Sequence, residues 1–130
     1  MRRYALAIVI LLLFFSSCTK NNTGVNCPQC TSAISFKNNI LPIFAASCSV
    51  RGCHDVATHA AAVILDSANA YSNVTAHGTG FVTAYNVNAS LLYTTLNSNG
   101  VNGMPKGLPP LPQCQVEDIA CWINQGAQNN

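Results

Sequence analysis

The residues with the clearest chemical potential lie in the segment Cys48–His54, which reads C-S-V-R-G-C-H. Two thiols can add to the two vinyl groups of a haem, and an imidazole directly after the second thiol can reach the iron. The usual spacing for this attachment is C-x-x-C-H, whereas four residues separate the cysteines here. Gly52 gives the backbone the freedom that the longer segment needs. The segment therefore predicts a covalent haem on Cys48 and Cys53, with His54 as the proximal iron ligand.

One methionine lies beyond the first residue of the chain, and its surroundings make it a candidate for the opposite side of the iron. Met104 lies in the segment G-M-P-K-G, fifty residues after His54. A lone methionine usually fills a gap in a core, but this one is flanked by Gly and Pro in a polar loop. His/Met ligation raises the reduction potential and leaves no open position for a substrate. Met104 is therefore predicted as the distal ligand, with His59 and His77 as alternatives that are more typical of exposed or structural histidines.

Other functions remain open at this point. Cys48 and Cys53 could form a disulfide beside an incidental His54, in a lipoprotein that is stabilised by disulfides and holds no cofactor. A haem enzyme of the peroxidase type would need an open or displaceable sixth position on the iron, and Met104 argues against one. The chain has no Gly-rich phosphate loop, carboxylate pair or nucleophile triad. We therefore expect an electron carrier and not an enzyme.

The start of the chain resembles an export signal. Two arginines precede an apolar run from about Ala5 to Phe15, as in a secretory signal peptide over residues 1–17. The run of roughly 11 residues is shorter than the about 20 that a membrane span needs. The letters F-S-S-C before and at Cys18 resemble a bacterial lipoprotein signal, which predicts cleavage before Cys18 and a lipid anchor on its thiol. A plain signal peptide that is cut elsewhere is the alternative.

Residues 18–26 are polar and lack periodicity, so we expect a lipid anchor and tether there, followed by one domain over residues 27–130. The anchor predicts a lipoprotein on the periplasm-facing side of a membrane, or elsewhere in the cell envelope. Of the six lysines and arginines, Arg2 and Arg3 belong to the signal, and the remaining four balance four acidic residues. A formal charge of zero is a poor basis for nucleic-acid binding. The expected partners are redox proteins.

The spacing of apolar residues predicts a mostly α fold of three to five short helices with long loops. Ser35 is the expected N-cap of the first helix, and Pro42 is expected to kink it or delay its start. In a later helix that follows Ser90, three leucines are expected to turn inward. The expected helices cover about residues 36–47, 67–73, 90–96 and 113–125.

The order of these features resembles the class I cytochrome c family, in particular its small lipoprotein members in Bacteroidetes and planctomycetes. The resemblance covers about residues 34–127. It rests on I-S-F-K-N-N-I-L-P-I-F (34–44), the Cys48–His54 segment, S-L-L-Y (90–93), Met104-Pro105 and I-A-C-W-I-N-Q-G-A (119–127). In that family the first and last helices cross, and the haem lies between the Cys-Cys-His segment and the Met loop. The resemblance implies a cytochrome c-like fold around one covalent haem c, with single-electron transfer as its function.

The four remaining cysteines of the exported part are disulfide candidates, since export places them in an oxidising compartment. They are Cys27, Cys30, Cys114 and Cys121. Two helical residues seven apart are separated by about 10 Å, beyond the ~7 Å limit for a disulfide, so the last two should not pair together. In the resembled family the entry to the first helix lies near the last helix. The resemblance therefore implies that the first two cysteines pair with the last two, in either order, with a local Cys27–Cys30 bond as the alternative.

Overall fold

The computed structural model describes residue 27 and residues 30–76, 80–98 and 102–130. Helix is the only regular secondary structure in these ranges, which confirms the predicted mostly α class with long loops. The elements are the π-helix η1 (Phe36–Ile40), α2 (Leu41–Ser47), the 3-10 helix η2 (Ala60–Ala62), α3 (Ala70–Thr75), the 3-10 helix η3 (Val87–Ala89), α4 (Leu91–Leu96) and α5 (Gln113–Asn124). The expected signal peptide, tether and lipidated Cys18 lie outside the described residues. Within those ranges no helix has both the length and the hydropathy to cross a bilayer.

The first helix begins where the sequence predicts and changes register at its proline. Ser35 is the N-cap, and its hydroxyl accepts a hydrogen bond of 3.1 Å from the Asn38 N–H. The helix starts in π geometry, with the Leu41 N–H bonded to the Phe36 carbonyl, and continues as α2 from Leu41. Pro42 has no N–H to donate, so the α-helix starts late, at the residue before it. This confirms the expected disturbance at Pro42.

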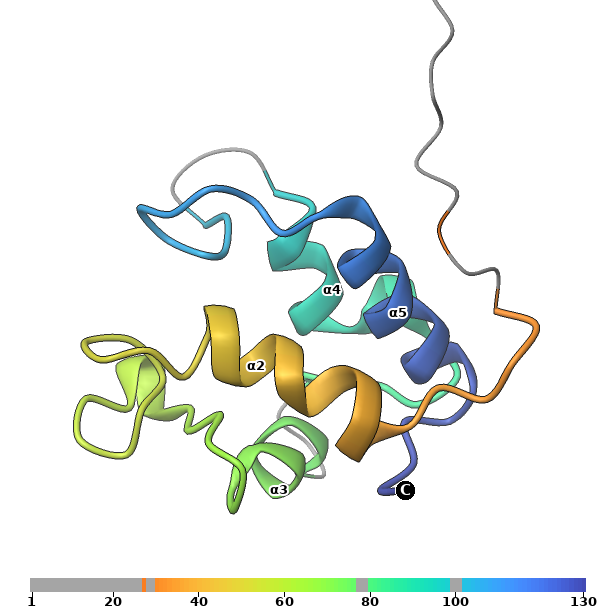
Figure 1. Cartoon of the computed structure of the whole chain (residues 1–130), viewed down its shortest axis with the longest axis horizontal. Helices are drawn as coiled ribbons and strands as arrows, with labels where there is room; N and C mark the ends of the chain where they lie inside the picture. Colours follow the sequence, from red (N-terminus) through yellow and green to blue (C-terminus); the bar gives the residue numbers. More distant parts are fainter. Residues whose placement is uncertain (1–26, 28–29, 77–79, 99–101) are drawn as a thin grey trace, which may run out of the picture.

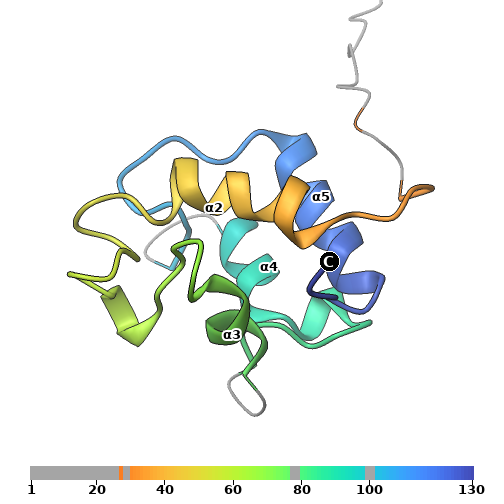
Figure 2. The ribbon, with the colours of Figure 1, turned by 60° about the horizontal axis from the view of Figure 1, so that its bottom comes forward.

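An aromatic cluster joins the first helix to α3 and α5. The Phe36 ring lies 5.3 Å from the Trp122 ring and 5.1 Å from the Tyr71 ring, measured between centroids. Phe44 packs edge-on against Phe36 at 6.2 Å. Phe44 and Trp122 are almost fully buried, and burying a side chain of this size contributes about 1.5–3 kcal/mol. The core therefore lies where η1 and α2 meet α5 (Figures 1 and 2).

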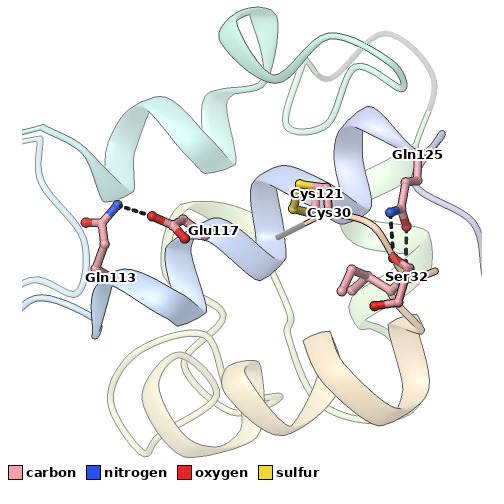
Figure 3. Close-up of a disulfide and its surroundings, with 7 residues drawn as sticks. Cys30, Ser32, Gln113, Glu117, Cys121 and Gln125 are labelled. Atoms are coloured by element: carbon pink, nitrogen blue, oxygen red, sulfur yellow. Dashed lines mark hydrogen bonds between the residues drawn. A yellow bond between two sulfur atoms is a disulfide. The ribbon is translucent and has the colours of Figure 1, made fainter. Parts of the chain in front are cut away.

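Two disulfides fasten the start of the domain to α5. Cys27 pairs with Cys114 and Cys30 with Cys121, with Cα atoms 4.8 Å and 5.4 Å apart. The expected cross-pairing is thereby confirmed, and its order is resolved. Figure 3 shows the second bridge beside the Gln125 side chain, whose Nε2 donates to the Ser32 carbonyl at 2.9 Å. The disulfide and this hydrogen bond together hold the entry to the first helix against the last helix.

The end of the chain also holds the first helix, in a way that the sequence analysis did not predict. The Asn130 side-chain oxygen accepts from the Phe36 N–H at 2.8 Å, and its backbone oxygen accepts from the Lys37 N–H at 3.0 Å. The first N–H groups of a helix have no partner within the helix. Asn130 therefore supplies two of the missing acceptors, and Figure 1 shows the C-terminal end beside the start of the first helix.

We expect Asn130→Ala to lower the free energy of unfolding by about 1 kcal/mol, because the Phe36 N–H loses its acceptor. Urea denaturation followed by circular dichroism measures this change. The matched control is Asn129→Ala, since Asn129 is an exposed neighbour, and it should change the stability by less than about 0.5 kcal/mol. Equal effects of the two substitutions would contradict a capping role for the Asn130 side chain.

Two predicted helices differ in detail from the structure. The second helix was expected after Ser67, but α3 begins at Ala70. Asp66 explains the delay, because its carboxylate accepts from the Asn69 N–H at 2.8 Å and holds a turn before the helix. In α4, Leu91 is 45% exposed and does not turn inward. Leu92 and Leu96 are four residues apart and share one face of the helix, whereas Leu91 points about 100° away from Leu92.

Candidate cofactor site

The two cysteines and the histidine lie on one turn that directly follows α2. Cys48 is the C-cap of α2, and its N–H donates to the Phe44 carbonyl at 2.9 Å. The chain then folds back, because the Cys53 N–H donates to the Val50 carbonyl at 3.0 Å. The His54 N–H donates to the Cys48 carbonyl at 3.1 Å. The longer Cys–Cys spacing is thus accommodated by a closed turn that brings the three predicted residues together.

Both cysteines of the turn are free thiols and are half-buried. The other four cysteines of the described ranges are paired in the two disulfides. Burial raises the pKa of the Cys48 thiol to about 11, and the nearby Cys53 adds to the shift. The thiolate is the form that attacks disulfides, so the raised pKa makes Cys48 less reactive in disulfide exchange at neutral pH.

His54 is held by a backbone carbonyl. Its Nδ1 lies 3.3 Å from the Val63 oxygen, and its own carbonyl accepts from the Leu65 N–H at 2.9 Å. A carbonyl can only accept, so a hydrogen bond here requires the proton on Nδ1, and in the neutral imidazole the Nε2 lone pair is then free for a metal. A metal-ligating histidine needs this arrangement, in which the second nitrogen is oriented by a partner. The side chain is half-buried.

Asp55 is a functional candidate that the sequence analysis missed. Its Oδ1 accepts from the N–H groups of Ala57 and Thr58, both at 2.8 Å, and its Oδ2 accepts from the Gly52 N–H at 2.7 Å. These backbone hydrogen bonds, that of Thr58 foremost, hold the pKa of the Asp55 carboxyl below its usual range. An aspartate side chain commonly bonds to the backbone about two residues farther on in such a turn, so the sequence held a signal for it.

The predicted distal ligand lies at the same end of the molecule. The Met104 N–H donates to the Thr95 carbonyl near the end of α4 at 3.0 Å, and the Met104 side chain is half-buried. In both Figure 1 and Figure 2 the loop over residues 102–112 lies at the end of the molecule that also carries the turn after α2. The two segments that carry the predicted ligands are fifty residues apart in the chain, and they lie at one end of the fold.

Helix α4 presents an apolar surface that the described residues bury only in part. Four of its six residues are large and apolar, yet none is buried. Leu92, Tyr93 and Leu96 pack only partly against the core, as does Leu111 after the Met104 loop. Large apolar side chains in a helix of this kind are ordinarily covered. The Met104 N–H donates to Thr95 of the same helix, so this partly exposed apolar surface lies beside the loop that carries Met104.

The donor set fits a haem. Two free thiols precede an imidazole with an available Nε2, and a thioether lies on a tethered loop at the same end. Among the described residues no three His, Cys, Asp or Glu side chains gather into a group that could hold a metal ion. A haem iron takes four ligands from the porphyrin and needs only one side chain on each side. One imidazole and one thioether are side chains of the kind and number that a haem iron needs.

Of the two alternative distal ligands predicted from the sequence, the structure describes His59. His59 is exposed, and its Nδ1 lies 3.2 Å from the Val56 carbonyl. His77 lies outside the described residues, as Cys18 does. A surface hollow of about 1010 Å³ lies between α3, residues 80–84 and the turn at Gly126, and no residue of the Cys48–His54 turn lines it. That hollow is consequently not part of the candidate site.

Comparison of the chain with models of protein families, with curated proteins and with solved structures found no match. The likeness to class I cytochromes c therefore rests on the sequence motifs themselves. The contacts of the Cys48–His54 turn and of Met104 are the structural basis for assigning a function.

Proposed function

We propose that the chain is a monohaem c-type cytochrome that carries single electrons. Cys48 and Cys53 hold the haem through thioether bonds, His54 is the proximal ligand and Met104 the distal ligand of the iron. The observation that carries the proposal is the turn after α2, in which two free thiols precede an imidazole whose Nδ1 is already bonded to the Val63 carbonyl. Haem attachment requires these groups together.

When bound, the haem supplies a reversible one-electron redox couple, and the polypeptide orients and insulates it. The Val63 carbonyl keeps the proton of His54 on Nδ1, which raises the basicity of the ligating nitrogen. The Thr95 carbonyl ties the backbone of Met104 to α4. Leu92 and Leu96 would exclude water from the porphyrin, and a dry site with a methionine ligand favours the reduced iron.

The proposal places the carrier outside the cytoplasm, on a membrane to which a lipid on Cys18 attaches it. The two disulfides support export, because such bonds persist in oxidising compartments. Electron donors and acceptors would then be other redox proteins of the cell envelope. Balanced charges on the exported part give no basis for a nucleic-acid partner.

The proposal is tested by the absorbance spectrum of the purified chain, made in a host that has haem-attachment machinery. The reduced protein should show the bands of a low-spin haem, and these bands should stay with the protein after acid-acetone extraction. A colourless protein would favour a lipoprotein without cofactor. A haem that extraction removes would contradict the thioether bonds, and a high-spin spectrum would favour an enzyme of the peroxidase type with an open position on the iron.

Met104→Ala should remove the weak absorbance band of the Fe–S bond in the oxidised protein and open a position for small ligands such as carbon monoxide. The reduction potential should fall by on the order of 100 mV, because the thioether stabilises the reduced iron. Spectroelectrochemistry measures both effects. The matched control is Leu108→Ala in the same loop, where the side chain is 49% exposed, and it should leave the band in place. An unchanged spectrum in Met104→Ala would move the distal role to His59 or His77.

A further inference from the structure

The segment around the second cysteine has little regular structure to fix its shape. Between the end of α2 and the short η2, the backbone is held by turns. Gly52 adopts a φ of +87°, and the space beside its Cα is open. The closing bonds from Cys53 to Val50 and from His54 to Cys48 hold the inner side of the turn. The Ala60 N–H donates to the Cys53 carbonyl and the Leu65 N–H to the His54 carbonyl, both at 2.9 Å, and these bonds hold the loop farther on. They leave the N–H groups of Gly52, Ala57 and Thr58 to be fixed by another group.

Asp55 is that group, because its carboxylate bonds to the chain on both sides of Cys53 and His54. One oxygen accepts from Gly52 at 2.7 Å, ahead of the two residues, and the other accepts from Ala57 and Thr58 at 2.8 Å behind them. The Asp55 carbonyl also accepts from the His59 N–H at 2.8 Å. One side chain thus connects the extended part of the Cys–Cys segment to the loop that follows the histidine.

We propose that Asp55 is a positioning residue for haem attachment, which fixes the backbone on both sides of Cys53 and His54 before the haem binds. This inference rests on the proposed function. In each addition a sulfur–carbon bond forms at one vinyl carbon and the thiol hydrogen goes to the other, so no oxidant is consumed. The two vinyl groups lie at fixed positions on one haem, so both sulfurs must be oriented toward them. The additions are faster when the backbone already holds the two cysteines in that orientation. The longer spacing gives the backbone between the cysteines more conformational freedom, and the hydrogen bonds of Asp55 reduce that freedom.

Replacement of Asp55 by asparagine separates its contact with Gly52 from its contacts with Ala57 and Thr58. In Asp55→Asn the amide oxygen can still accept from Ala57 and Thr58, but the amide nitrogen is a donor and cannot accept from Gly52. Asp55→Ala removes all three hydrogen bonds. The matched control is Asp66→Ala, which removes a carboxylate that accepts from the Asn69 N–H at 2.8 Å, in a turn outside the Cys48–His54 segment.

The four chains are made in a host with haem-attachment machinery, under conditions in which attachment is limiting, and intact mass spectrometry gives the fraction that carries haem. We expect Asp66→Ala to lie within about twofold of the unchanged chain, and Asp55→Ala to be about tenfold lower, which corresponds to about 1.4 kcal/mol. Asp55→Asn should lie between them. Hydrogen exchange of the haem-free chains should show faster exchange at Gly52 alone in Asp55→Asn.

Asp55→Ala that carries as much haem as Asp66→Ala would overturn the inference while the proposed function stands. If the unchanged chain carries no haem, the proposed function fails and the inference fails with it. If Asp55→Ala does not fold, as shown by its thermal unfolding, Asp55→Asn decides. A lower haem fraction at an unchanged melting temperature supports positioning by Asp55, and an unchanged haem fraction overturns it.

Discussion

A chain in which Cys48 and Cys53 are both alanine is expected to contain no covalent haem. Each single substitution removes one thioether bond and should lower the haem fraction that survives acid-acetone extraction, and the double substitution leaves no thiol in the turn to react. The measurement is the haem absorbance per protein molecule after extraction, together with the intact mass. The effect should be all or none for the double variant, because the other cysteines of the described ranges are already paired.

The matched control is the chain with Cys27 and Cys114 both replaced by alanine, which also loses two cysteines but keeps the turn after α2. It should retain its covalent haem, since its second disulfide still fastens the entry segment to α5. Covalent haem in the Cys48→Ala, Cys53→Ala chain would show that other residues attach it. Loss of haem to the same extent in both double variants would show that attachment depends on folding alone.

Removal of both disulfides is expected to unfold most of the domain. The two bridges close loops of 87 and 91 residues, and a loop of that size contributes about 4–5 kcal/mol in the chain-entropy model. The two loops nearly coincide, so either bridge alone still restricts the unfolded chain to almost the same extent. Removing one bridge should therefore cost only about 1–3 kcal/mol. Removing both should cost about 5 kcal/mol or more, a large part of the stability of a domain this size.

Denaturant unfolding of the two double variants and of the quadruple variant measures these differences. The Cys30, Cys121 pair should cost more than the Cys27, Cys114 pair, because Cys121 is buried in the core whereas Cys114 is half-buried. Additive effects of the two pairs would contradict the view that both bridges close essentially the same loop. A quadruple variant within about 1 kcal/mol of the unchanged chain would contradict a stabilising role for either bridge.

The first and last helices could be predicted from the sequence because their signals are local. Ser35, Pro42 and the apolar spacing define the first helix, and Pro112 precedes α5 at Gln113. The disulfide pattern needed more than local signals, since spacing excludes only the Cys114–Cys121 pair and the resemblance implied the rest. The structure then decided the order of pairing, which depends on how the entry segment runs along α5.

The supporting contacts of the candidate site could not be predicted, because most of them involve backbone atoms. The contact of His54 with Val63 spans nine residues of irregular chain, and any residue at position 63 would offer the same carbonyl. The contacts of Asn130 with the first helix depend on where the two ends of the domain meet. The contacts of Asp55 could have been predicted, because its side-chain hydrogen bonds reach only two and three residues along the chain.

If one haem joins Cys48 to Cys53 through two thioether bonds, the position of Arg51 between the two cysteines allows a direct test of both bonds. Trypsin cuts after Lys37, Arg51 and Lys106, so it places Cys48 in the peptide over residues 38–51 and Cys53 in the peptide over residues 52–106. After full reduction of disulfides, we predict a single species with the mass of both peptides plus one haem. Two separate peptides of unmodified mass would contradict the account.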